Sequence, residues 1–539
     1  MGKSTIDVEA EVIKCAESIP QFKDRLEEYY KTIWTKKEVP EQWRITRITP
    51  IWKNKGSASD PTKYRGISIG SILSKVGMNI ILKRISSFYE SQLKLSQFGF
   101  RKGVGCSDGI YVIKQLHEIA SLSQKELFAC YIDLSSAFDH VDRKLLFQTV
   151  KNRLPQNSST TNIDILENLY LDTRSFLQNE NQTNAFPTSA GVRQGGTEGP
   201  PLYNLYSDYA LRVYDNRKTE AGVEGLNIPY QIAHEATNRE QRSNAPSSGT
   251  SQDDDVGYAD DLGIFAWSQE ELQTCINILA KVFEEFGLEI NLDKTKTMIM
   301  NSTTTTTDNN YPESIICING TAIENTPSFK YLGVWITYNK LSIGNEELEH
   351  RINSAHIAFS ENRKLLTNMN VGLQTRMMFL NALVRSRLTY GCHCWRPNAQ
   401  EISKIESTYH YFLRCMVYNG HKRVNPPAHR ASDSGSSTTS TESSDDEDTD
   451  WSYIITNKKL LNITCTESLK QFYEKQQHNF VAHIIRRENN NIAKNLMFHN
   501  VVRTKRGRKS PSILESVIGR TGMERSEFLK ASFLKMNQL

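Results

Sequence analysis

The chain contains 539 residues, of which 38% are hydrophobic and 23% charged, and its formal net charge is +4. This length predicts roughly three or four domains, and the composition excludes a chain that is disordered throughout. There is no apolar run of about 18 residues to span a membrane and no N-terminal apolar segment typical of a secretion signal. We therefore expect no membrane association and a location in the nucleus, the cytoplasm or both.

The N-terminal part alternates between helical and strand-like patterns. Apolar spacing predicts a helix over residues 5–35, a strand over 44–51 and a helix over 71–86. The segment ELFACYIDL (126–134) is typical of a short buried strand that ends on Asp133. Helical spacing resumes at Asp139, and a Gly- and Pro-rich loop that begins at Gly191 leads into another helix.

The centre of the chain contains a polar insertion followed by an apolar hairpin. Residues 234–255 are of low complexity, and we expect them to be disordered. Directly after them, VGYADDLGIFA (256–266) contains two apolar strands joined by a turn on Asp260 and Asp261. Helices are predicted over 268–286 and over most of 341–420.

The C-terminal part is marked by two charged tracts. Residues 432–450 are rich in serine and acidic residues and predict a disordered linker. The later run RTKRGRKS (503–510) is a candidate nuclear-import signal or phosphate-contacting arm, and a solvated basic loop is the alternative.

Three carboxylates at the ends of apolar strands suggest a metal site. Asp260 and Asp261 alone could simply form a turn, because aspartate favours turns. A third strand that ends on Asp133 changes this interpretation, because buried carboxylates repel one another unless cations balance them. Two Mg²⁺ ions would bring a charge of about +4 against the roughly −3 of the three carboxylates, as in two-metal phosphoryl transfer. Mn²⁺ could substitute for Mg²⁺. Mg²⁺ prefers oxygen ligands.

Several motifs together resemble one known family. YIDLSSAFDHVDR, GVRQGG, YADDLGIFA, GLEINLDKTK and FKYLGVWI follow PEQWRITRITPIWKNKG, YRGIS and SQFGFRKGVGCSD, and RLTYGCHCW comes after them. In this order they resemble the reverse transcriptases of non-LTR (LINE-type) retrotransposons over about residues 35–400. The resemblance implies an α+β right-hand polymerase fold with fingers, a palm with a short antiparallel sheet, and a helical thumb.

The resemblance also implies a domain organisation. We expect a helical lead-in over 1–34, fingers over 35–125, a palm over 126–340, a helical thumb over 341–425, an acidic disordered linker over 426–450 and a small helical tail with a basic run over 451–539. Members of the family usually carry an endonuclease. No endonuclease is recognisable here, so we expect a polymerase without its own nicking activity.

At matching positions the resemblance implies roles in catalysis. Asp133, Asp260 and Asp261 would bind the metal ions, with the main-chain carbonyl of Leu134 as a further ligand. Lys294 would be the general acid for the leaving pyrophosphate, and Lys296 is its rival.

Other matching positions would contact the substrates. Phe138 matches a steric gate that favours deoxynucleotides, and a core phenylalanine is the alternative. Lys53, Lys55 and Arg65 match the fingers residues that bind the incoming triphosphate, although either lysine alone could be a solvated surface residue.

Three further motifs match positions that contact the template and the primer. The motif near the template contains Gln97, Gly99, Phe100 and Arg101. The loop that holds the template and the base pair contains Arg193, Gln194 and Gly195, and the turn that grips the primer contains Tyr331, Leu332 and Gly333.

The resemblance implies an RNA-directed DNA polymerase that uses template RNA, a DNA primer and deoxynucleoside triphosphates. It does not indicate the oligomeric state.

One departure from the family is the loop GTEGPPLY (196–203), where the family has roughly CPLSPLLF. Glu198 in this loop brings a negative charge close to the loop that handles the template, which could lower efficiency. An alternative is therefore a decayed or host-adopted fold that binds nucleic acid without catalysis. A third interpretation, an RNA-templated RNA polymerase, is opposed by Phe138.

Overall fold

The computed structural model describes residues 16, 18–54, 56–156, 158–177, 185–237, 248–301, 314–338, 343–417, 455–501 and 511–534. The chain divides into two compact units. The first comprises Met1–Asn339, Ile484–Lys509 and Leu529–Leu539, and the second Lys340–His483 and Ser510–Phe528. Among the helices of these described ranges, none is both long and apolar enough to cross a membrane.

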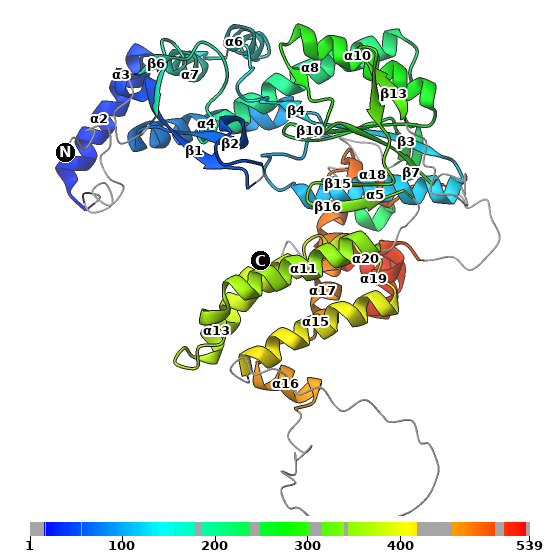
Figure 1. Ribbon diagram of the computed structural model, residues 1–539. Helices are drawn as coiled ribbons and strands as arrows, with labels where there is room; N and C mark the ends of the chain where they lie inside the picture. Colours follow the sequence, from blue (N-terminus) through cyan, green and yellow to red (C-terminus); the bar gives the residue numbers. More distant parts are fainter. Residues whose placement is uncertain are drawn as a thin grey trace, which may run out of the picture. The chain divides into compact units, whose positions relative to one another are not determined.

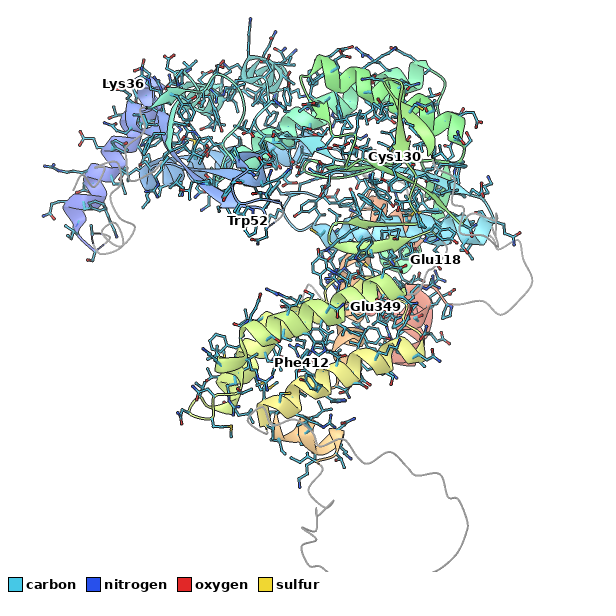
Figure 2. The ribbon with its side chains drawn as sticks, in the orientation of Figure 1. Lys36, Trp52, Glu118, Cys130, Glu349 and Phe412 are labelled. Atoms are coloured by element: carbon cyan, nitrogen blue, oxygen red, sulfur yellow. The ribbon has the colours of Figure 1, made fainter. Side chains whose placement is uncertain are left out.

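An antiparallel four-stranded sheet lies at the centre of the first unit, in the order β12-β3-β10-β9. Its strands are β3 (Leu127–Ile132), β9 (Asp255–Tyr258), β10 (Asp261–Ala266) and β12 (Lys296–Met300). Helices α8 (Gly199–Glu220) and α10 (Gln269–Glu285) lie on one side of it and α5 (Cys106–Ser123) on the other (Figure 1). Cys130 on β3 is fully buried among the surrounding side chains (Figure 2). The sheet is apolar on both faces because helices cover both, and it confirms the expected α+β class.

A second sheet of the first unit has the order β2-β1-β5-β6. It is formed by β1 (Ile45–Trp52), β2 (Tyr64–Ile69), β5 (Arg174–Leu177) and β6 (Phe186–Pro187). Strands β1 and β2 form an antiparallel hairpin in which Ile51 lies opposite Arg65. Helix α2 (Pro20–Lys36) begins later than the predicted helix over 5–35, and residues 1–15 lie outside the described residues.

The other elements of the first unit are short or connect these sheets. They are α3 (Glu41–Arg44), η1 (Pro61–Lys63), α4 (Ile72–Gln92), β4 (Leu134–Ser135), α6 (Arg143–Asn152), α7 (Thr161–Leu169), β7 (Ile228–Gln231), η2 (His234–Ala236), β8 (Ser248–Ser251), β11 (Glu289–Ile290), β13 (Ser314–Ile318), β14 (Thr321–Glu324), β15 (Ser328–Tyr331), β16 (Val334–Thr337) and α18 (Ile492–Met497).

The expectation of disorder over residues 234–255 is wrong for the part that the structure describes. Residues 234–236 form η2, and β8 pairs antiparallel with β7. Asp254 is buried, and the Nζ atom of Lys218 donates to both of its carboxylate oxygens at 2.7 Å. The polar composition did not predict this order, because Lys218, whose charge offsets that of Asp254, lies 36 residues earlier in the sequence. Residues 238–247 lie outside the described residues.

The second unit is helical. Its elements are α11 (Asn345–Glu361), α12 (Arg363–Leu366), α13 (Leu373–Phe379), the π-helix η3 (Leu380–Arg385), α14 (Ser386–Leu388), η4 (Cys392–Cys394), α15 (Ala399–Val417), α16 (Asn457–Ile463), α17 (Leu469–Ile485), α19 (Ile513–Thr521) and α20 (Arg525–Leu534). The boundaries between the two units fall inside α17 and α20. Phe412, labelled in Figure 2, is fully buried in the core of this unit.

The structure does not support a separate C-terminal tail over 451–539. Leu460 and Leu469 belong to the same hydrophobic core as Phe412, so α16 and the start of α17 are part of the helical second unit. Residues 484–509 belong instead to the first unit, where α18 packs against α5 and β7. Periodicity could identify these helices but not the core that each one joins. The predicted linker over 426–450 and the basic run over 503–510 lie outside the described residues.

Candidate active site

The turn between β9 and β10 carries two of the predicted site residues. Strand β9 ends at Tyr258 and β10 begins at Asp261, which pairs with Tyr258. Ala259 and Asp260 form the connection, and Ala259 has a left-handed backbone with φ +58°. Positive φ is uncommon for residues other than glycine, so neighbouring groups must stabilise this turn. The hairpin with carboxylates at its tip is present as expected.

Asp133 reaches the same edge of the sheet from the neighbouring strand. Because Ile132 pairs with Leu262, Asp133 leaves β3 beside the point where Asp261 enters β10. Its backbone N–H donates to the Thr295 hydroxyl at 3.4 Å and its backbone carbonyl accepts from the N–H of Asn291 at 2.8 Å. These contacts position the third carboxylate. Leu134, the next residue, is buried in β4.

The three carboxylates influence one another electrostatically. Burial, together with the nearby charge of Asp133, raises the pKa of Asp260. Burial and then the charges of Asp260 and Asp133 raise the pKa of Asp261 to about 6. Lys294 offsets only part of this repulsion. The arrangement therefore has an excess of negative charge that favours binding of a cation.

The structure separates the two candidate lysines. The Nζ atom of Lys294 donates to Oδ2 of Asp133 at 2.7 Å. The Nζ atom of Lys296 instead donates to Oε2 of Glu324 at 2.7 Å and to a backbone carbonyl. Lys294 is thus the lysine that contacts a site carboxylate.

Phe138 is half-buried and stacks on Tyr203. The ring centroids are 4.7 Å apart and the planes differ by 11°. Tyr203 is fully buried, and burial with the nearby charges of Asp260 and Asp261 raises its pKa. Its ring therefore supports one face of Phe138. Tyr203 is not among the site residues that the motifs predict, and its only signal in the sequence is a tyrosine within an apolar helical segment.

Two of the residues matched to triphosphate binding are described by the structure, and both are exposed. Arg65 is exposed on β2, and its charge lowers the pKa of Asp260. Lys53 is exposed after β1, and its Nζ atom donates to the backbone carbonyl of Thr62 at 3.0 Å. Arg65 therefore lies within electrostatic range of the carboxylates. Lys55 lies outside the described residues.

The loop that carries Gln194 and Gly195 lies against β2. The backbone carbonyl of Gln194 accepts from the N–H of Ser68 at 2.7 Å. Gly195 has φ +108°, and a Cβ atom there would lie 2.8 Å from the side chain of Ile67. Glycine is required here by both the backbone conformation and the close approach.

Glu198 lies beside the loop that carries Arg193 and Gln194, as expected, but its charge is buried. Glu198 is 3% exposed, and its Oε1 atom accepts from the hydroxyl of Tyr170 at 3.4 Å and lies 3.9 Å from Nη1 of Arg193. The Nη2 atom of Arg193 donates to the backbone carbonyl of Trp43 at 2.9 Å. Arg193 and Glu198 are therefore both buried, and each offsets the charge of the other.

Gln97 and Tyr331, which lie in the motifs matched to the template and the primer, contact the hairpin. The Oε1 atom of Gln97 accepts from the backbone N–H of Ala259 at 3.0 Å. The hydroxyl of Tyr331 donates to the backbone carbonyls of Val256 at 2.8 Å and Asp261 at 3.2 Å. Both side chains are buried.

The oxygen donors of the three aspartates fit a Mg²⁺ site that is completed by the substrate. Within the described ranges, no three His, Cys, Asp or Glu side chains are gathered closely enough to enclose a metal ion. Such a cage is not required for Mg²⁺, which usually binds through one or two carboxylates and substrate phosphates. The oxygen donors of Asp133, Asp260 and Asp261 and their mutual repulsion fit this mode of binding.

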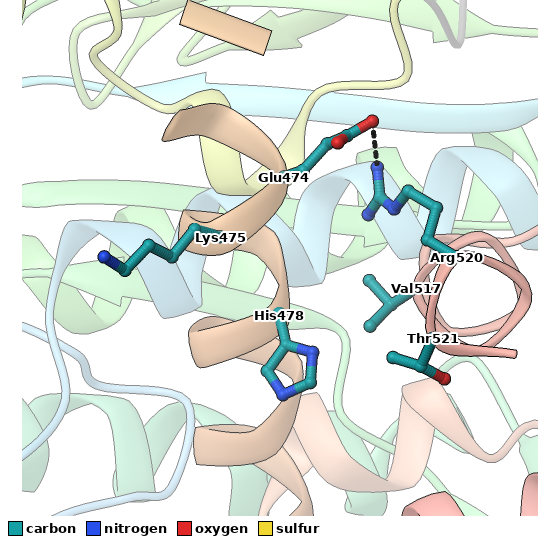
Figure 3. Close-up of a pocket in the computed structure, with 6 residues that line it drawn as sticks. All are labelled: Glu474, Lys475, His478, Val517, Arg520 and Thr521. Carbon is teal, nitrogen blue, oxygen red and sulfur yellow. Dashed lines mark ion pairs between the residues drawn. The ribbon is translucent and has the colours of Figure 1, made fainter. Parts of the chain in front are cut away.

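A cavity elsewhere in the molecule is not part of this site. It lies between α17 and α19 in the second unit and has a volume of about 310 Å³. Figure 3 shows its six lining residues, Glu474, Lys475, His478, Val517, Arg520 and Thr521, with an ion pair of 3.7 Å between Glu474 and Arg520. None of the site carboxylates lines it.

Comparisons with known proteins agree with the resemblance. The family model described as "Reverse transcriptase (RNA-dependent DNA polymerase)" matches residues 51–336, more than half of the chain. A probable RNA-directed DNA polymerase from transposon BS of Drosophila melanogaster is 30% identical over 183 residues, 33% of this chain and 20% of the relative. The RNA-directed DNA polymerase from mobile element jockey of the same organism is 22% identical over 372 residues, 66% of this chain and 33% of the relative.

Among solved structures, apo telomerase from Candida tropicalis matches with a TM-score of 0.39 and 10% identity, over 74% of this chain and 67% of that chain, a similarity too distant to carry an argument. The chain spans only a fifth to a third of the length of the two transposon relatives. The family match nevertheless covers both strands of the hairpin, Asp133 and Lys294. The chain belongs to the reverse transcriptase (RNA-dependent DNA polymerase) family.

Proposed function

We propose that this chain is a LINE-type reverse transcriptase, which copies RNA into DNA by adding deoxynucleotides to a primer 3′-OH. One observation carries the proposal: Asp133 and the Asp260–Asp261 pair lie at one edge of a sheet, where burial and the charges of Asp260 and Asp133 raise the pKa of Asp261 to about 6. A fold without catalytic function has little reason to keep this repulsion, because it destabilises the folded chain.

Asp133, Asp260 and Asp261 would hold two Mg²⁺ ions, with the Leu134 carbonyl as a further oxygen donor and Mn²⁺ as a substitute. When bound, divalent ions of this kind activate the attacking hydroxyl and stabilise the developing charge on the leaving group. The contribution of the protein is to keep the carboxylates at the edge of the sheet and to balance part of their charge with Lys294.

Lys294 is proposed as the general acid. Its ammonium group contacts Asp133 and its side chain is 62% exposed, so it can also reach a bound pyrophosphate. From this position Lys294 would donate a proton to the leaving pyrophosphate, and a positioned general acid of this kind accelerates the reaction. Lys296 lacks this position because it pairs with Glu324.

Phe138 is proposed as the steric gate, supported from behind by Tyr203. A ring held at this position would collide with a ribose 2′-OH and so favour deoxynucleotides. Arg65, Lys53 and Lys55 are proposed to bind the triphosphate, since guanidinium and ammonium groups are the usual partners of phosphate.

Template RNA and a DNA primer are the proposed macromolecular partners, with the RNA recognised largely through its backbone and 2′-OH groups. The non-catalytic alternative rested partly on the variant loop 196–203. The burial of Glu198 beside Arg193 weakens one argument for that alternative, since the negative charge of this loop is not exposed.

Primer extension on poly(rA)/oligo(dT) with dTTP and Mg²⁺ tests the proposal. The double variant Asp260→Asn/Asp261→Asn is expected to lose on the order of 10³-fold or more in kcat. A matched control is Asp24→Asn/Glu28→Gln, which removes two exposed charges from α2. If the wild-type chain extends the primer no faster than the Asp260→Asn/Asp261→Asn variant, the polymerase proposal is wrong and the non-catalytic alternative remains.

A further inference from the structure

We propose that Gln97 is a positioning residue, which holds the turn between β9 and β10 in the conformation that presents Asp260 and Asp261. The inference rests on the proposed polymerase function and adds to it a residue that acts through the backbone. Gln97 belongs to the segment SQFGF, 162 residues before the turn in sequence.

The contacts of the Gln97 side chain point to this role. It is 3% exposed, and its single Oε1 atom accepts from the backbone N–H groups of Ala259 at 3.0 Å and Gly99 at 2.9 Å. Ala259 has φ +58° and directly precedes Asp260. The amide oxygen thus satisfies the backbone donor of the one left-handed residue in the turn, a conformation that an alanine rarely adopts without such support.

The backbone on both sides of Gln97 pairs with β9. The N–H of Phe98 donates to the carbonyl of Gly257 at 2.8 Å, and the N–H of Gly257 donates to the carbonyl of Ser96 at 2.9 Å. A Cβ atom on Gly99 would lie 2.5 Å from the backbone nitrogen of Ala259. Gly99 therefore permits a close approach that brings the Gln97 amide to the turn.

The same segment is anchored at the beginning of β9. The Ser96 hydroxyl donates to Oδ2 of Asp255 at 2.9 Å, and the Nζ atom of Lys94 donates to Oδ1 of Asp255 at 3.0 Å. Residues 94–99 therefore contact β9 at its first residue and at the turn that follows its last residue. A segment fixed at both points can define where the turn lies relative to β3 and Asp133.

The burial of the amide argues against direct contact with nucleic acid. Loss of the Gln97 amide would instead leave the N–H of Ala259 without its acceptor in a buried turn. A buried donor without a partner favours a change of conformation. Functional side chains need to be held within about 0.5 Å of their productive position. Loss of residues that orient metal ligands typically reduces metal affinity or activity by about 10- to 100-fold.

The decisive variant is Gln97→Met, which keeps the length of the side chain and removes the acceptor. Gln273→Met on α10 is the matched control. Gln273 also bonds to backbone, accepting from the N–H of Cys317 at 2.8 Å and donating to its carbonyl at 2.7 Å, but at an element that carries none of the site residues. Gln97→Glu is the second variant, because it keeps an acceptor oxygen at the same reach.

Two readouts are compared on the full chain: amide hydrogen exchange over residues 256–262, and kcat and KM for dTTP. Gln97→Met is expected to speed exchange in this segment and to lower kcat by about 10- to 100-fold with KM within about 3-fold. Gln273→Met should leave both at the wild-type level. Gln97→Glu should keep the wild-type exchange.

Unchanged exchange in Gln97→Met, or fast exchange in Gln97→Glu, would overturn the inference. So would a loss of kcat in Gln97→Met no larger than in Gln273→Met. If the wild-type chain is inactive, the proposed polymerase function fails, and the exchange data still decide whether Gln97 holds the turn.

Discussion

The ammonium group of Lys294 lies 2.7 Å from Oδ2 of Asp133, although 161 residues separate the two in sequence. Their contact brings a proton donor to the edge of the sheet where the site carboxylates meet. Lys296 is only two residues away but pairs with Glu324 at 2.7 Å. The two lysines therefore form a matched pair for testing which of them acts in the reaction.

Lys294→Gln is expected to lower kcat for single-nucleotide addition by about 10²- to 10⁴-fold, the usual contribution of a general acid. Lys296→Gln should keep kcat within a few-fold because its ion pair lies at an exposed carboxylate. Rapid-quench measurements with saturating dTTP give both rates. Equal losses in the two variants would contradict the role of Lys294.

Asp261→Asn is expected to stabilise the metal-free chain at pH 7 and to lose this advantage below about pH 4. Burial and the neighbouring carboxylates raise the pKa of Asp261 from 3.8 to about 6, so the folded state binds the proton more tightly than the unfolded state. The contribution of this carboxyl to stability is complete below the unfolded pKa and is lost as the pH rises through about 6. At pH 7 the gain from asparagine should be roughly 1 to 3 kcal/mol, since one pKa unit corresponds to about 1.4 kcal/mol.

Urea unfolding in the presence of a chelator, at pH 4 and pH 7, measures this difference. Asp24→Asn on the exposed side of α2 is the control and should change the free energy of unfolding little at either pH. A stabilising effect of Asp261→Asn that does not depend on pH would show that repulsion among the carboxylates is not its cause.

Phe138→Ala is expected to weaken discrimination against ribonucleotides. Removal of the ring should reduce the ratio of kcat/KM for dTTP over ribothymidine triphosphate by roughly 10- to 100-fold, the range in which pockets reject one added group. Tyr203→Phe is the control, because it keeps the stacked ring and removes only the buried hydroxyl. An unchanged ratio in Phe138→Ala would assign Phe138 to the core alone.

Glu198→Gln is expected to destabilise the fold without changing template binding. The change weakens a buried interaction with Arg193 and Tyr170, and the loss should be about 1 to 3 kcal/mol in the free energy of unfolding. Glu220→Gln, at the exposed end of the same helix, is the control. Fluorescence anisotropy should give the same Kd for primer–template in all three proteins, and tighter binding by Glu198→Gln would indicate that its charge does reach the template.

The sequence by itself determined the local part of this site. Apolar runs interrupted by Asp133, Asp260 and Asp261 predicted two strand ends and a hairpin with carboxylates, and both are present at those residues. Such predictions succeed because strand periodicity and turn formation depend on residues that are close in sequence. The family resemblance and the α+β class followed from the same motifs, and both are confirmed.

Tertiary structure alone decided what the other side chains contact. Glu198 points inward to Arg193, Gln97 reaches the turn at Ala259, and Lys294 rather than Lys296 contacts Asp133. Residues 248–255 are ordered where their polar composition predicted disorder. The physical reason is common to these cases: a buried charge or amide is stabilised by a partner that folding brings close, and linear spacing contains no information on that partner.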